Sequence, residues 1–155
     1  MSIALHTQAP NFQAQSTQGE EPFDLYKQAQ GEAVILYFYP KDFTPVCTLE
    51  VCEFRDTFEF FKKLNIRVLG ISKDDIETHR KFKEAHQLPF ELLADPDGEV
   101  ARLYDAYMPE IKFTKRVTYL LDTNHRIVHI SNNIFENQEG ILAMVKELQE
   151  KATVL

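Results

Sequence analysis

The two cysteines of this chain lie five residues apart, in the segment TPVCTLEVC at residues 44–52. Thr44 is a residue type that often caps the N-terminus of a helix, and Pro45 is favoured at the first helical position. Cys47 would then be the third helical residue, beside the Thr44 hydroxyl. Free backbone N–H groups and the positive end of the helix dipole favour a thiolate there. The pattern predicts a reactive sulfur, although inert buried cysteines are common.

Cys52 is expected on the same helix as Cys47, too far away for a direct bond. The two Cα atoms would be about 8.7 Å apart in an ideal helix, whereas a disulfide needs them within about 7 Å. A bridge therefore requires the first helical turns to unwind. It would be a poor structural staple, because it closes a short loop, but it would suit a catalytic cycle. Spacing alone leaves open whether Cys52 takes part in such a cycle or is passive.

Composition limits the classes of protein to which the chain could belong. Its 155 residues, 44% of them hydrophobic, suffice for one domain over residues 1–155. A net charge of −7 argues against electrostatic binding to nucleic acid or a membrane surface. The start MSIALHTQAP lacks the pattern of a signal peptide, and the apolar run AVILYFYP is too short to cross a bilayer. We expect a cytoplasmic protein, in which two close cysteines indicate redox chemistry or metal binding.

The order of predicted elements indicates the fold. Residues 33–39 and 66–72 are continuous apolar runs typical of strands buried on both faces. A helix is expected between them, because apolar residues recur there at helical spacing. These residues are Val51, Phe54, Phe58 and Phe61. The strand–helix–strand unit must be parallel and right-handed. With the later elements, it predicts a thioredoxin-like α/β fold with a central mixed sheet, flanking helices and an N-terminal extension over residues 1–32.

The remaining elements follow from shorter patterns. DDIETHRKFKEAHQ predicts a capped helix that ends before Pro89, with His79 and His86 interpreted as surface residues on one face. APNF and FELLAD are predicted to be short strands, and DPDGEVARLYDAY a turn and a short helix. RVTYLLD and RIVHIS flank TNH and predict a hairpin. NQEGILAMVKELQEK is expected to form a closing amphipathic helix.

The cysteine segment also carries a family resemblance. YFYPKDFTPVCTLEVCEFRD resembles the active-site segment of peroxiredoxins, whose pattern P-x-x-x-T-x-x-C is filled by Pro40, Thr44 and Cys47. The second cysteine, five residues on, is similar to that of the bacterioferritin comigratory protein or peroxiredoxin Q subfamily. The resemblance continues through GISKDD, HRKFKEAHQLPFELLADPDGEVARLY and RVTYLLD, and so covers nearly the whole chain. Val46 departs from the glycine that this subfamily usually has before the reactive cysteine.

The resemblance implies a thiol-dependent peroxidase of the atypical two-cysteine type. Cys47 would attack hydrogen peroxide or an organic hydroperoxide and become a sulfenic acid, and Cys52 would condense with it to an intramolecular disulfide. An external dithiol protein such as thioredoxin would reduce the bridge. No metal, flavin or haem is required. Members of this subfamily tend to be monomers, and we expect a monomer here.

The same resemblance implies roles for four further residues. Thr44 would hold the sulfur and the peroxide by hydrogen bonds, and Pro40 would shield the sulfenic acid from water. Arg116 would supply a permanent cation with several donors. Glu50 would orient this arginine. Spacing alone would favour reading both Arg116 and Glu50 as solvated surface charges.

Other classes of function explain the sequence less well. A thiol–disulfide oxidoreductase of this fold would be expected to have a C-x-x-C motif, which the chain lacks. A metal-binding module could use Cys47, Cys52 and a histidine, but zinc sites usually have closer cysteine pairs and four ligands. A scaffold without catalytic activity would leave the combination of Thr44, Cys47 and Arg116 unexplained.

Overall fold

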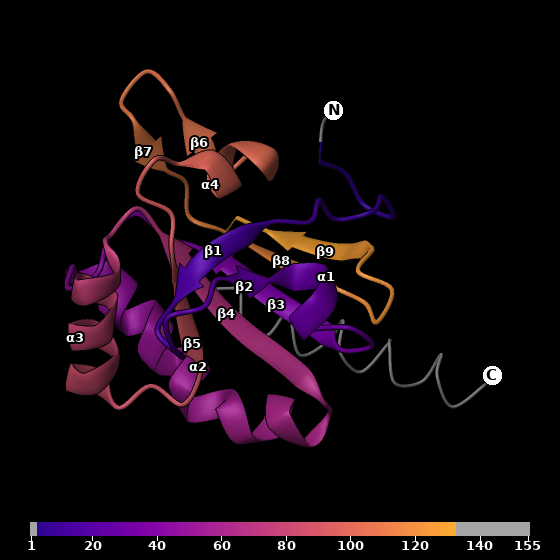
Figure 1. The fold of residues 1–155 in the computed structure, drawn as a ribbon, viewed down its shortest axis with the longest axis horizontal. Helices are drawn as coiled ribbons and strands as arrows, with labels where there is room; N and C mark the ends of the chain where they lie inside the picture. The colour runs from indigo at the N-terminus through magenta and orange to yellow at the C-terminus, as the bar shows by residue number, and fades with distance from the viewer. Residues whose placement is uncertain (1–2, 133–155) are drawn as a thin grey trace.

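A seven-stranded mixed sheet lies at the centre of the fold (Figure 1), in the order β2-β1-β5-β4-β3-β8-β9. The computed structural model describes residues 3–132 of the chain, apart from the side chain of Glu50. The strands of this sheet are β1 (Gln13–Ser16), β2 (Phe23–Asp24), β3 (Ala33–Phe38), β4 (Ile66–Ser72), β5 (Glu91–Ala94), β8 (Val117–Leu121) and β9 (Ile127–Ser131). A separate two-stranded sheet comprises β6 (Tyr107–Met108) and β7 (Phe113–Thr114). The helices are α1 (Leu25–Gln28), α2 (Pro45–Lys63), α3 (Ile76–His86) and α4 (Glu99–Leu103).

The strand pairing agrees with most of the sequence-based expectations. Helix α2 connects β3 to β4, and these two strands pair in parallel. β4 also pairs in parallel with β5. β8 and β9 form the predicted antiparallel hairpin, and β8 also pairs antiparallel with β3. The predicted mixed sheet flanked by helices is therefore confirmed. The predicted C-terminal helix lies outside the described residues.

One predicted strand in the N-terminal extension is wrong. The segment APNF, residues 9–12, is not a strand; β1 begins immediately after it and pairs antiparallel with β2 and β5. Pro10 has no N–H to donate to a strand ladder. Ala9 and Phe12 are instead buried in the core.

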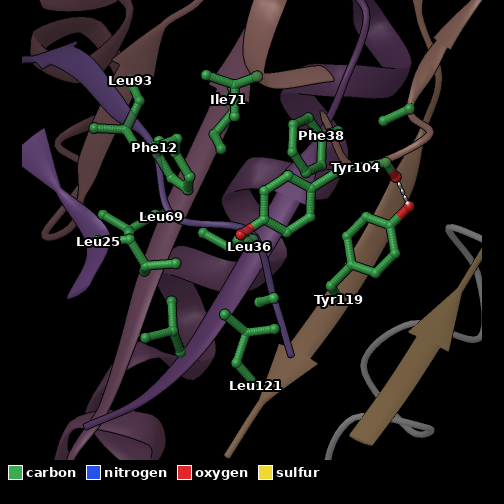
Figure 2. Close-up of a cluster of buried hydrophobic side chains, with 14 of the residues drawn as sticks. Phe12, Leu25, Leu36, Phe38, Leu69, Ile71, Leu93, Tyr104, Tyr119 and Leu121 are labelled. Carbon is green, nitrogen blue, oxygen red and sulfur yellow. Dashed lines mark hydrogen bonds between the residues drawn. The ribbon is translucent and has the colours of Figure 1, made fainter. Parts of the chain in front are cut away.

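Alternate residues of β3 enter two hydrophobic clusters, because successive side chains of a strand point to opposite faces of a sheet. One cluster contains Leu36, and α1 and α4 contribute Leu25 and Val100 to it. Figure 2 shows this cluster, in which the Tyr119 hydroxyl donates a hydrogen bond to the Tyr104 carbonyl. The other cluster lies beneath α2 and α3 and includes Cys47. The sheet therefore supports the cysteine helix on one face only.

Gly70 of β4 makes room for the Tyr37 side chain of the neighbouring strand β3. The two residues are register partners, and the buried Tyr37 ring stacks on Phe54 of α2 at 4.7 Å between ring centroids. A Cβ atom at position 70 would lie 2.8 Å from the Tyr37 ring and 2.9 Å from Leu92 Cδ2. The absence of a side chain at Gly70 thus allows the ring to fit between β4 and the helix that carries both cysteines.

We expect Gly70→Ala to lower the free energy of unfolding by about 1–3 kcal/mol, the usual range for overpacking a core. Urea denaturation would measure this loss. Gly19→Ala is a matched control, because nothing lies within 4 Å of a Cβ at that position, and its stability should stay close to wild type. Equal stability of the two variants would mean that the Tyr37 ring moves aside without cost.

Candidate active site

Helix α2 begins at Pro45, so Cys47 is its third residue, as predicted. Thr44 precedes the helix in an extended conformation, with φ −92° and ψ 149°. The Cys47 side chain is buried, and it belongs to the cluster that Val51 and Phe54 form on the same helix face. The sulfur therefore lies at the end of α2 where backbone N–H groups lack helical partners and the helix dipole is positive.

The structure brings Arg116 to Cys47. The Nη1 atom of the half-buried Arg116 donates a hydrogen bond to Cys47 Sγ at 3.3 Å, although the two residues are 69 positions apart in the sequence. The pairing of β8 with β3 causes this approach, because Arg116 immediately precedes Val117, the register partner of Phe38. A permanent cation in contact with sulfur stabilises negative charge on it. The arrangement can therefore hold a thiolate.

The Thr44 hydroxyl does not cap the helix, so the expectation that it lies beside the Cys47 amide is wrong. It donates instead to the Lys41 carbonyl at 3.0 Å, and no side-chain bond to a helical N–H is formed. The loop turns back on itself because Phe43 adopts a left-handed conformation, with φ 62°. This turn directs the hydroxyl toward the beginning of the loop.

The other two predicted site residues lie near this helix end. Pro40 is half-buried where β3 leads into the loop, and it lines a pocket together with Asp74 and Thr114. Glu50 is part of α2, one turn after Cys47. Its side chain lies outside the described part of the chain, so its predicted action on Arg116 stays a prediction.

Cys52 lies further along the same continuous helix, half-buried, and neither cysteine is in a disulfide. Its Sγ atom is 3.9 Å from Nδ1 of His86, the last residue of α3. The two sulfurs therefore have different neighbours: an arginine for Cys47 and a histidine for Cys52. Because α2 is unbroken between them, a disulfide requires this part of the helix to unwind.

A second histidine, His79, is fully buried, so its interpretation as a surface residue is wrong. Its Nε2 atom is 3.0 Å from the Leu93 carbonyl, which can only accept, so Nε2 carries a hydrogen. Its Nδ1 atom lies 2.6 Å from an oxygen of the buried Asp42, and this pair therefore shares a proton. The available signal was the spacing of His79, Phe82 and His86, which places all three on the inner face of α3.

This histidine anchors the loop that precedes the cysteine helix. The Tyr39 hydroxyl donates to the other Asp42 oxygen at 2.5 Å, and the Asp42 amide donates to Asp74 at 2.8 Å. Burial, together with the nearby negative charge of Asp42, raises the pKa of Tyr39. Ligand atoms of Asp42, Asp74 and His79 lie within 4.8 Å of one another, but those of Asp42 and His79 already bond to each other. The cluster therefore fixes the loop between Pro40 and Thr44.

We expect His79→Phe to lower the free energy of unfolding by about 3–5 kcal/mol, because it leaves a buried carboxylate without its partner. Urea denaturation would measure the loss. The double variant with Asp42→Asn should lose less than the sum of the two single variants, because no uncompensated charge remains. Additive losses would show that Asp42 and His79 stabilise the fold independently.

Comparisons with known proteins agree with this fold and site. Residues 5–130 match the AhpC/TSA family. The chain is 39% identical to peroxiredoxin Bcp of Bacillus subtilis over 83% of this chain and 84% of that protein. It is also 39% identical to the chloroplastic peroxiredoxin Q of Oryza sativa subsp. japonica, over 91% of this chain but only 64% of that protein.

Solved structures of peroxiredoxins also resemble this chain. Peroxidoxin BcpB from Mycobacterium tuberculosis has a TM-score of 0.86 at 26% identity, covering 94% of this chain and 97% of that one. Xanthomonas campestris peroxiredoxin Q has a TM-score of 0.80 at 26% identity, covering 88% and 90%. The chain belongs to the AhpC/TSA family, within its Bcp and peroxiredoxin Q peroxiredoxins, which are thiol-dependent peroxidases. The predicted family and thioredoxin-like fold are thus confirmed. Within residues 3–132, no helix has the length and apolar character needed to cross a membrane.

Proposed function

We propose that Cys47 is the nucleophile with which this chain reduces hydrogen peroxide and organic hydroperoxides. The observation that carries the proposal is the 3.3 Å contact between Arg116 and the buried Cys47 sulfur at the start of α2. The thiolate attacks one peroxide oxygen, the O–O bond breaks, and the other oxygen leaves with the electron pair and takes up a proton. Arg116 stabilises the negative charge on the sulfur and on the departing oxygen.

Three other residues assist this step. Thr44 binds the sulfur and the peroxide once its hydroxyl has rotated away from the Lys41 carbonyl, to which it donates in the reduced enzyme. Pro40 shields the sulfenic acid from water, and its half-buried position beside the helix start is consistent with this role. Glu50 orients Arg116 from one turn along α2.

Cys52 resolves the sulfenic acid of Cys47. The Cys52 sulfur attacks, an S–S bond forms, the S–O bond breaks, and water is released. This step needs local unwinding of α2, after which an external dithiol protein such as thioredoxin reduces the bridge by exchange. We propose that the enzyme works in this way as a monomer in the cytoplasm.

We expect Arg116→Ala to slow the oxidation of Cys47 by about 10²–10³-fold, the usual effect of removing one donor that stabilises developing charge. Rapid-quench intact-mass measurement of a single turnover would give this rate. Cys47→Ser should abolish turnover, because a serine hydroxyl is not ionised near neutral pH.

Arg80→Ala is the matched control for the arginine, since Arg80 is exposed on α3 and pairs with Glu77. It should oxidise at the wild-type rate. An unchanged rate for Arg116→Ala would remove Arg116 from the mechanism, and normal turnover of Cys47→Ser would overturn the proposed function.

We expect Cys52→Ser to reduce one equivalent of peroxide and then stall, because thiolate attack does not need Cys52 whereas the disulfide does. After peroxide treatment in the absence of reductant, the intact mass of wild type should fall by two hydrogens, and that of the variant should rise by oxygen. If the variant cycles with thioredoxin as fast as wild type, Cys52 is a bystander. Covalent dimers of wild type on a non-reducing gel would show instead that the bridge joins two chains.

A further inference from the structure

The half-buried His86 contacts the sulfur of Cys52, and the reaction described above assigns it no part. Its Nδ1 atom is 3.9 Å from Cys52 Sγ, within the range of a hydrogen bond to sulfur. Resolution of a sulfenic acid needs a thiolate, so the Cys52 thiol must lose its proton before it attacks. An imidazole in contact with that thiol is the kind of group that can accept the proton near neutral pH.

Apolar rings hold the imidazole in place. The His86 ring packs edge-on against Phe82 at 4.9 Å between ring centroids, and it also lies 6.4 Å from the Phe43 ring. Its backbone carbonyl accepts a hydrogen bond from Arg55 Nη1 at 3.0 Å, which joins the end of α3 to α2. The contact between His86 and Cys52 thus lies within a packed junction of two helices.

The charges near His86 act in opposite directions. His86 is the last residue of α3, and the negative end of a helix dipole stabilises a cationic imidazole. From α2, Arg55 disfavours that cation, but its charge is offset by an ion pair with Asp56 at 3.1 Å, and a Cys52 thiolate favours the cation. Lys83, one turn earlier on α3, is paired with Glu91 at 2.7 Å. An imidazolium–thiolate pair therefore has support from the helix end and from its own mutual attraction.

We propose that His86 is a catalytic base for the resolving step, an inference that rests on the proposed function. The Cys52 S–H bond breaks and an N–H bond forms on His86. The Cys52 thiolate attacks the Cys47 sulfur, the S–S bond forms, and the S–O bond breaks. The departing hydroxide takes the proton back from the imidazolium and leaves as water. The two thiol-derived sulfurs end in a disulfide, and no further reactant is consumed.

Local packing allows the base to stay beside Cys52 while Cys47 moves. Cys52 packs against the cluster beneath α2 and α3, as does Phe58 further along the helix. The turns before it carry the exposed side chains of Val46 and Leu49. Unwinding of these turns would bring Cys47 toward a thiol that is still in contact with His86.

The test follows the resolving step alone. Reduced enzyme receives one equivalent of hydrogen peroxide without reductant, the reaction is quenched with acid, and intact mass separates sulfenic acid from disulfide. A thiol with the ordinary pKa of about 8.5 is only about 3% ionised near pH 7, so His86→Gln should slow disulfide formation by up to about 30-fold. Formation of the sulfenic acid should be unchanged. Near pH 9.5, where hydroxide in solution can take the place of the imidazole as base, the variant should approach the wild-type rate.

Two controls distinguish a base from a packing residue. His6→Gln removes an exposed histidine and should leave both steps unchanged. In a Cys47→Ser background, His86→Gln should also slow alkylation of Cys52 by iodoacetamide near pH 7, a readout that does not depend on unwinding of the helix or on peroxidase activity.

Three results would overturn the proposal. One is wild-type disulfide formation in His86→Gln near pH 7. Another is a defect that persists undiminished near pH 9.5, which would assign His86 to packing. The third is unchanged Cys52 alkylation in the Cys47→Ser background. Failure of the proposed function is distinct, because wild type itself would then form no sulfenic acid or no intramolecular disulfide.

Discussion

The contact between Arg116 and Cys47 depends on the pairing of two strands that are distant in the sequence, since it joins residues 69 positions apart. Arg116 reaches the sulfur because β8 pairs antiparallel with β3, the strand that leads into the cysteine helix. The helix in turn is held over β3 and β4 by the stack of Tyr37 on Phe54. A change in strand register would move the cation away from the sulfur. The charge that stabilises a thiolate is therefore a product of the fold, which local sequence around Cys47 cannot supply.

The proposed cycle places two opposing demands on α2. Peroxide attack needs the first turn intact, because that turn positions Cys47 against Arg116, whereas disulfide formation needs the same turns to unwind. The packing of the helix separates these demands along its length. Val46 and Leu49 in the first turns are exposed, whereas Phe54 and Phe61 further along are fully buried. Unwinding the turns between the cysteines thus uncovers Cys47 and Val51 but leaves Phe54 and Phe61 in place, so the rest of α2 can stay on the sheet.

The sequence predicted those features that depend on periodicity or on a short motif. The apolar runs of β3 and β4, the helical spacing after Pro45 and the two-cysteine pattern were sufficient for the fold and for the position of Cys47. Features that depend on the exact backbone conformation of a loop, or on contacts between distant residues, were missed. The Thr44 hydroxyl turns to the Lys41 carbonyl because of the left-handed backbone at Phe43, which no pattern indicated. The contact between Arg116 and Cys47 could be anticipated only from family resemblance, because spacing alone favoured a surface charge.

The two histidines of α3 show why a side-chain pattern can mislead. His79 and His86 were read as a surface pair on one helix face, yet His79 is fully buried and His86 is half-buried against Phe82. His79 can be buried because Asp42 forms a hydrogen bond with its ring nitrogen. This bond also ties the loop before α2 to α3. His86, seven residues on, meets Cys52 on α2 at the other end of α3. One helix thus secures the loop that leads to Cys47 and also holds a base beside Cys52. The proposed chemistry then separates the two sulfurs: a permanent cation stabilises the thiolate that must persist until peroxide arrives, whereas a titratable base ionises the thiol that attacks afterwards.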